Sequence, residues 1–168
     1  MHSCPIFSWS YTEAIMKSVV FCTSVRFKKD LAGFIAELRK LATEKGLHPV
    51  ILEPNFEERP MGFEQLHEKD RLIANANYRE TVAGKVYDHL FRKVRVADVC
   101  FIFNKDGYLG ANTNGELFAA AMAGKMCYAL HPKTLMGSYP NDLYEEPSSH
   151  KLIHEVVETP EELLKRLA

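Results

Sequence analysis

Apolar residues occur along the chain in short runs that are separated by longer amphipathic stretches. Runs rich in β-branched and aromatic residues lie at 18–24, 48–53, 99–103 and 126–130, and a further run lies at 153–157. Continuous apolar runs of this length, bounded by glycine, proline and polar residues, are typical of strands that are buried on both faces. We therefore expect five strands, with the fifth at an edge of the sheet.

Helical patterns fill the intervals between these runs. Residues 29–45 place their apolar side chains on one helical face, and residues 63–96 hold one or two helices. A capping box at 159–162 opens the last helix. The proline-rich stretches at 54–62 and 131–149 are expected to be surface loops.

Strands that alternate with helices favour a parallel sheet with right-handed crossovers. The sequence therefore predicts an α/β fold: a three-layer doubly wound sandwich with a five-stranded, mainly parallel sheet in the order 2-1-3-4-5, as in flavodoxin-like and Rossmann-like proteins. A chain of 168 residues with 46% hydrophobic content suits one core. We expect a single domain at 18–168, preceded by an N-terminal extension or arm at 1–17.

Charge and cysteine content narrow the class of partner. The 21 basic and 22 acidic residues give a net charge of −1, which argues against a duplex nucleic-acid partner. No apolar run approaches the length of a transmembrane helix, so we expect no membrane partner. Three of the four cysteines lie in predicted strands, and no CxxC pair marks a zinc site or a disulfide framework. We therefore expect a cytoplasmic protein with a small-molecule partner, no cofactor and no metal.

Two loops are expected to meet where the strand order reverses, between the first and third strands, because ligands of such sheets bind there. Arg26 and Lys28 supply positive charge after the first strand, and Ser24 supplies a hydroxyl, which together suit a phosphate or a carboxylate. Solvated surface charge explains Arg26 and Lys28 equally well. A glycine-rich loop follows the third strand. Its residues that we expect to bind substrate are Asn104, Asp106, Gly107, Tyr108, Gly110, Asn112, Thr113 and Asn114.

The carboxylate of Glu116 comes directly after this loop. A helix is expected to begin near Thr113 or Asn114 and to end at Gly124, which places Glu116 in its first turn. The helix dipole would then hold the carboxylate ionised. An ionised carboxylate at a helix start is either an ordinary capping residue or a usable nucleophile, and the spacing alone leaves both open.

Several short motifs, taken together, indicate a family. They are Thr23-Ser24-Val25-Arg26-Phe27, Ala97-Asp98, Asp106-Gly107-Tyr108-Leu109-Gly110, and Asn114-Gly115-Glu116 followed by Ala120, Ala121, Gly124 and Lys125. Their order and spacing, over about residues 18–130, resemble the nucleoside 2-deoxyribosyltransferase superfamily. That superfamily also includes the deoxynucleoside 5′-monophosphate N-glycosidases and many uncharacterised small bacterial proteins.

This resemblance implies cleavage of the N-glycosidic bond of a (deoxy)nucleoside or a nucleoside 5′-monophosphate, by hydrolysis or by transfer of the deoxyribosyl group. It implies that Glu116 is the nucleophile and that Asp98 organises the site, although capping of the strand entry explains Asp98 equally well. The position of the family's general acid falls near Asp88 and His89, which are the two candidates in this chain. Family members are commonly homodimers or larger homo-oligomers, and the apolar arm is a candidate interface.

A second interpretation comes from the departures from the family pattern. The loop before Glu116 is longer than the family's short acidic loop, and neither Asp88 nor His89 falls clearly in register for the general acid. On this interpretation, the chain is a nucleotide-binding or sensing protein that keeps the pocket but does not catalyse the reaction. A cytokinin-type phosphoribohydrolase is a weaker rival, because the PGGxGT signature of that family is absent.

Overall fold

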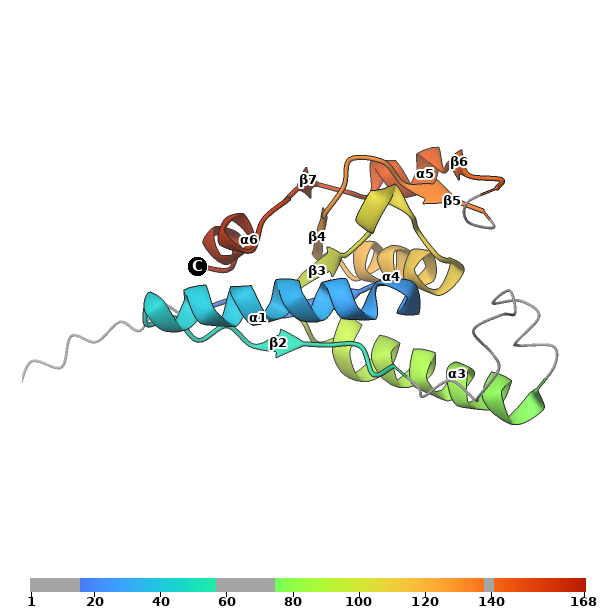
Figure 1. The fold of residues 1–168 in the computed structure, drawn as a ribbon, viewed down its shortest axis with the longest axis horizontal. Helices are drawn as coiled ribbons and strands as arrows, with labels where there is room; N and C mark the ends of the chain where they lie inside the picture. Colours follow the sequence, from blue (N-terminus) through green and yellow to red (C-terminus); the bar gives the residue numbers. More distant parts are fainter. Residues whose placement is uncertain (1–15, 57–74, 138–140) are drawn as a thin grey trace, which may run out of the picture.

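A five-stranded parallel sheet forms the centre of the molecule. The computed structural model describes residues 16–56, 75–137 and 141–168. The strands are adjacent in the order β2-β1-β3-β4-β7, and every neighbouring pair is parallel (Figure 1). Their bounds are β1 Val19–Cys22, β2 Ile51–Leu52, β3 Val99–Ile102, β4 Met126–Ala129 and β7 Glu155–Val156. This arrangement confirms the predicted α/β sandwich and its strand order, with β7 as the fifth strand.

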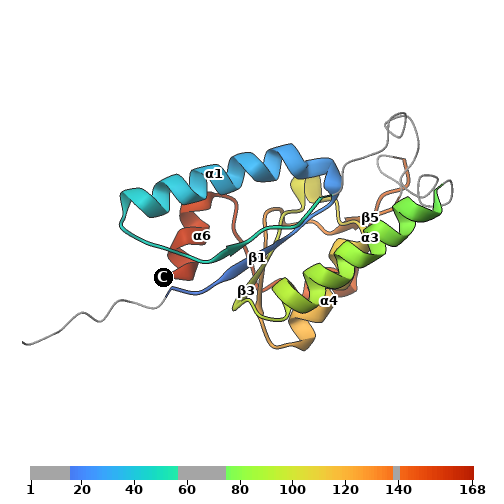
Figure 2. The same ribbon diagram turned by 90° about the horizontal axis from the view of Figure 1, so that it is seen from below.

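Helices cover both faces of the sheet. Within the described residues, the longest helices are α1 Lys28–Glu44, α3 Ala76–His89, α4 Ala111–Met122 and α6 Pro160–Leu167. α1 and α6 lie on one face, whereas α3 and α4 lie on the other (Figure 2). Side chains along β1 alternate between the two cores, so that Val19 and Phe21 face α1 while Val20 and Cys22 face α4. Every residue of β1 is buried for this reason, which explains the uninterrupted apolar run.

The helix ends follow the signals in the sequence. Gly46 follows α1 with a φ of +66°, a left-handed conformation that favours glycine. The capping box of α6 is present: the Thr159 hydroxyl accepts from the Glu162 N–H, and the Glu162 carboxylate accepts from the Thr159 N–H. α3 continues into a π-helical turn, η3 Leu90–Val94. Residues 63–74 of the predicted helical span, residues 57–62 of the predicted loop, and residues 1–15 of the arm lie outside the described residues.

The prediction of a long irregular loop at 131–149 is wrong. β5 Leu135–Met136 and β6 Tyr144–Glu145 pair as antiparallel strands, and α5 Pro147–Lys151 follows them. The backbone N–H of Leu109 donates to the Leu135 carbonyl at 2.7 Å, and Tyr108 forms an isolated bridge with the same residue. The small hairpin is thus tied by backbone pairing to the loop that follows β3, a contact that local composition does not encode.

The start of α4 also differs from the prediction. The helix begins at Ala111, and its N-cap is Gly110, which offers no side-chain hydrogen bond. Thr113 is buried within the first turn, and the Asn114 side chain accepts a hydrogen bond from the Ser149 hydroxyl at 2.6 Å. The contact with Ser149 takes the Asn114 side chain away from a capping role. Because the helix begins at Ala111, Glu116 lies in its second turn.

Candidate functional site

A pocket of about 340 Å³ lies at the carboxyl ends of β1 and β3, where the strand order reverses. The loop after β1 and the loop after β3 both line it, as the strand order predicts. α3 and the first turns of α4 supply further walls. The predicted site residues that line this pocket are Ser24, Arg26, His89, Tyr108, Gly110, Asn112, Thr113 and Glu116.

Glu116 projects from α4 into this pocket, and its side chain is only 7% exposed. Burial raises the pKa of its carboxyl from 4.5 to about 7, and a hydrogen bond from the Cys22 thiol opposes part of that rise. The prediction that the helix start holds Glu116 ionised is therefore wrong. In the second turn, the backbone N–H groups are already engaged within the helix and do not face the carboxylate. Both protonation states of Glu116 are populated near neutral pH.

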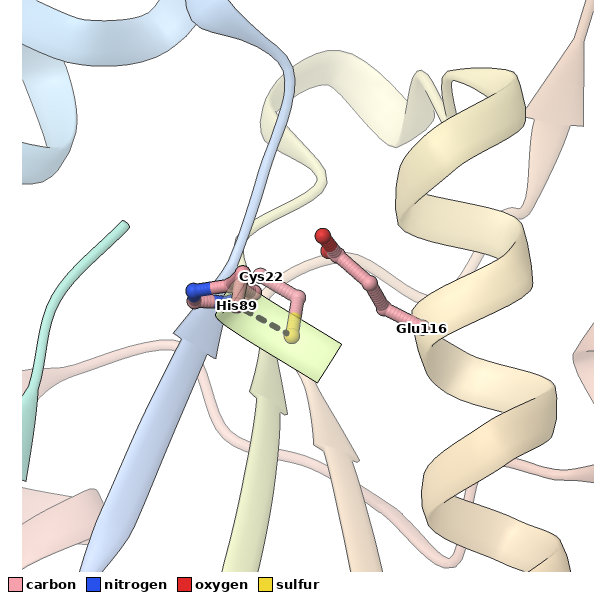
Figure 3. Close-up of side chains that lie close together, drawn as sticks. All are labelled: Cys22, His89 and Glu116. Carbon is pink, nitrogen blue, oxygen red and sulfur yellow. Dashed lines mark hydrogen bonds between the residues drawn. The ribbon is translucent and has the colours of Figure 1, made fainter. Parts of the chain in front are cut away.

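Cys22 and His89 lie beside Glu116 (Figure 3), and we call these three residues the floor cluster. His89 and Glu116 line the pocket, whereas Cys22 is not among its lining residues. Cys22 is the last residue of β1 and His89 the last residue of α3, and Cys22 Sγ lies 3.6 Å from His89 Nε2. Burial, followed by the charge of Lys93, lowers the pKa of His89 to about 4, against a smaller opposite effect of the Phe21 backbone. Burial raises the pKa of the Cys22 thiol to about 12. At neutral pH the floor cluster therefore holds a thiol, a neutral imidazole and a half-ionised carboxyl.

The opposite wall of the pocket carries a cation. The Ser24 hydroxyl accepts from the Arg26 N–H at 3.4 Å, which is a weak turn contact. The Arg26 guanidinium lies 4.5 Å from the centre of the Tyr108 ring, in a cation–π arrangement. The first residues of α4 line the same pocket, so the Arg26 guanidinium and the backbone N–H groups of the helix start both lie at its wall.

Four of the predicted binding residues do not line the pocket. The Asn104 side chain is fully buried, donates to the carbonyls of His131 and Lys133, and accepts from the His131 N–H. Asp106 is exposed, and its φ of +55° marks the turn that follows β3. Gly107 has a φ of +82° in the same turn, a left-handed backbone conformation that favours glycine. The fourth predicted residue outside the pocket lining is Asn114, whose side chain accepts the hydrogen bond from Ser149.

The two aspartates proposed from the resemblance also lie elsewhere. Asp98 is exposed at the amino end of β3, opposite the pocket, and its carboxylate accepts hydrogen bonds from the N–H and hydroxyl of Ser18. Those bonds lower its pKa. Asp88 forms an ion pair with Arg92 at 3.0 Å, one residue before His89 but outside the pocket lining. Of the two candidates for the general acid, the structure brings only His89 to Glu116.

Sequence reasoning missed several residues of the site. Cys22 was expected to lie in a strand, but its contact with His89 was not predicted. Lys85 and the aromatic residues Phe56 and Tyr78 line the pocket and were not predicted either. The available signal for Cys22 was its place as the last apolar residue before the predicted binding loop, because the carboxyl end of a parallel strand lies next to the ligand site of such sheets.

The fold and the pocket define an α/β protein with a pocket at the switch point of a parallel sheet. No protein-family model matches the chain, and no curated protein matches it. Among solved structures, it is similar to a conserved protein from Enterococcus faecalis V583, with a TM-score of 0.50 and 16% identity over 90% of this chain and 97% of that chain. At this identity the likeness shows the fold alone. Within the described ranges, no helix has the length and apolar character needed to span a bilayer.

Proposed function

We propose that the protein cleaves the N-glycosidic bond of a (deoxy)nucleoside or nucleoside 5′-monophosphate, as a hydrolase or a deoxyribosyltransferase, with Glu116 as the nucleophile. One observation carries this proposal: Glu116 is the only carboxylic acid among the described residues that line the switch-point pocket. A buried carboxyl that faces a pocket and has a strongly shifted pKa is typical of a reacting group. The motif resemblance around Asn114-Gly115-Glu116 points to the same residue.

The composition of the pocket supports a nucleotide-like ligand. Phe56, Tyr78 and Tyr108 offer aromatic surface to a base or a sugar, and Arg26 and Lys85 offer positive charge to a phosphate. The volume of about 340 Å³ is at the lower end of the range for small-molecule sites. A single nucleoside or mononucleotide suits such a pocket better than a dinucleotide.

The chemistry follows from the position of the carboxylate. In the ionised form, a Glu116 oxygen attacks the anomeric carbon, and the bond from that carbon to the base nitrogen breaks with its electron pair on the base. The base takes up a proton and leaves. Water then attacks the same carbon, which gives the free sugar and regenerates Glu116, whereas attack by a second base gives the transfer product.

His89 has a supporting place in this proposal. Because its pKa is lowered to about 4, the imidazole is neutral at pH 7 and serves as a hydrogen-bond partner for the ligand rather than as a stored proton. Asp88 lies outside the pocket lining, so it is not proposed as the acid. The departing base then receives its proton from water.

Chromatographic detection of free base tests the proposal directly. The protein is incubated with each deoxynucleoside and each deoxynucleoside 5′-monophosphate, and Glu116→Gln is compared with wild type. We expect the variant to lose at least about 10³-fold in rate, because the nucleophile is removed. Glu80→Gln is the matched control, since Glu80 is an exposed carboxylate on α3 outside the pocket. Release of no base from any substrate, or undiminished release by Glu116→Gln, refutes the proposal.

A second candidate function is nucleotide binding or sensing without chemistry. The observation that favours it is the lack of a second carboxylic acid among the described pocket residues, since most glycosidases use a pair. This alternative predicts that nucleotides raise the melting temperature through mass action while no base is released. The melting and chromatography experiments, run on the same ligands, separate the two candidates.

A further inference from the structure

The floor cluster consists of three side chains of types that ligate transition metals. One ligand atom from each of Cys22, His89 and Glu116 lies within 4.8 Å of the other two (Figure 3). The residues come from three separate elements, β1, α3 and α4, and each of them is buried. No sequence motif announces this set, because its members are brought together by the fold alone.

The separation of the sulfur and nitrogen atoms fits tetrahedral coordination. Cys22 Sγ and His89 Nε2 lie 3.6 Å apart. With Zn–S bonds of about 2.3 Å and Zn–N bonds of about 2.0–2.1 Å, two tetrahedral ligands lie about 3.5 Å from each other. One Glu116 oxygen lies within 4.8 Å of the ligand atoms offered by the other two residues, so a shift of roughly 1 Å would bring it to the tetrahedral separation.

The donor set selects the kind of cation. Thiolate and imidazole ligands suit Zn²⁺, whereas Mg²⁺ and Ca²⁺ prefer oxygen ligands alone. A Cys22 thiolate and a Glu116 carboxylate with a neutral His89 carry two negative charges, so a divalent cation leaves this buried site neutral. Burial of the two acidic groups without a cation favours their protonated forms, as the raised pKa values of about 12 and about 7 indicate.

We propose that Cys22, His89 and Glu116 bind Zn²⁺ or a similar borderline-soft divalent cation, with the fourth coordination position open to the pocket. The bound cation occupies the carboxylate of Glu116, and metal binding therefore inhibits base release. This inhibitory consequence rests on the proposed function, whereas the binding of the cation does not. His89 and Glu116 line the pocket, so the cation enters and leaves through it.

Titration with Co²⁺ tests the binding, because a cobalt–thiolate bond gives a charge-transfer band in the near ultraviolet. The titration uses a Cys4→Ser background, which removes the thiol that lies outside the described residues. We expect one Co²⁺ per chain, a thiolate band, and loss of the band when Zn²⁺ is added in equal amount. Cys22→Ser is expected to lose the band and at least about 100-fold in affinity. Cys127→Ala is the matched control, since it removes a buried thiol of β4 outside the cluster.

His89→Gln keeps the experiment decisive if circular dichroism shows that Cys22→Ser does not fold. It is expected to weaken Co²⁺ binding and to keep the thiolate band at saturating metal. Absence of a band in the parent protein, or unchanged affinity in a folded ligand variant, overturns the metal site.

Base release is measured first with EDTA and then with one equivalent of Zn²⁺, and inhibition by Zn²⁺ is expected. Equal release with the metal bound overturns the inhibitory part of the inference. Absence of base release under both conditions refutes the proposed function instead, and it leaves the Co²⁺ titration as an independent result.

Discussion

Replacement of Glu116 by glutamine is expected to stabilise the protein increasingly as the pH rises. Burial raises the pKa of this carboxyl from 4.5 in its ordinary state to about 7 in the folded chain. The unfolded chain therefore releases the proton near pH 4.5, while the folded chain keeps it until about pH 7. Between these values the unfolded state is progressively favoured, so the wild type loses stability as the pH rises. Glutamine has nearly the same shape and no proton to release.

The size of the effect follows from the same pKa values. A difference of about 2.5 between 4.5 and about 7 corresponds to about 3 kcal/mol, at 1.36 kcal/mol for each pKa unit. The wild type carries almost none of this penalty below pH 4.5 and nearly all of it above pH 7. For a chain of this length, about 3 kcal/mol corresponds to about 6–12 °C in melting temperature.

Urea unfolding from about pH 4.5 to about pH 8, with EDTA present, measures the difference in unfolding free energy between Glu116→Gln and wild type. His89 has its pKa lowered to about 4 and belongs to the floor cluster, but it titrates in both proteins and largely cancels from that difference. Glu80→Gln is the control variant, because Glu80 is exposed on α3 and lies outside the pocket. A difference that is constant with pH, or one that shrinks as the pH rises, refutes the reasoning.

Three further variants probe separate parts of the structure. Arg26→Leu should weaken the binding of nucleoside 5′-monophosphates about 10-fold or more and leave the binding of nucleosides nearly unchanged, because a charge-assisted hydrogen bond is worth about 1.5–3 kcal/mol. Thermal shifts measured with both classes of ligand check this, and equal weakening of both contradicts it. Gly107→Ala should destabilise the chain by about 1–3 kcal/mol, because φ is +82° and an added Cβ meets the Lys133 Cβ at 3.1 Å. Chemical unfolding measures this change, with Gly84→Ala, at an exposed position of α3, as the control. Thr159→Ala should cost about 1 kcal/mol by removal of the α6 cap, and an unchanged unfolding midpoint is the contrary result.

Much of the fold was accessible from the sequence because its signals are local. The residues of β1 and β3 are buried on both faces, so each strand reads as an unbroken apolar run. The capping box at Thr159 and the glycine after α1 depend on backbone geometry within a few residues. The meeting of the two binding loops follows from strand order, which alternation of strands and helices largely determines.

The parts that sequence reasoning missed depend on contacts between distant residues. The hairpin of β5 and β6 is tied to the loop after β3 through Leu135, and Asn114 is held by Ser149 rather than capping a helix. The floor cluster joins Cys22 and His89, which are 67 positions apart in the chain. To predict this cluster, the end of β1, the last turn of α3 and the second turn of α4 must all be located correctly. Hydrophobic periodicity locates each boundary only to within a few residues.

The environment of Glu116 links the two proposals physically. On the side away from the pocket, Cys22 Sγ lies 3.7 Å from Cys100 Sγ, and both cysteines belong to one apolar core cluster. A negative charge on Glu116 is therefore poorly compensated from that side, and compensation has to come from whatever occupies the pocket. The transition state of glycoside cleavage has oxocarbenium character and carries positive charge at the sugar, so a buried carboxylate stabilises it more than the neutral ground state. A divalent cation would compensate the same buried negative charge. One carboxylate therefore suits both a glycosyl transition state and a metal.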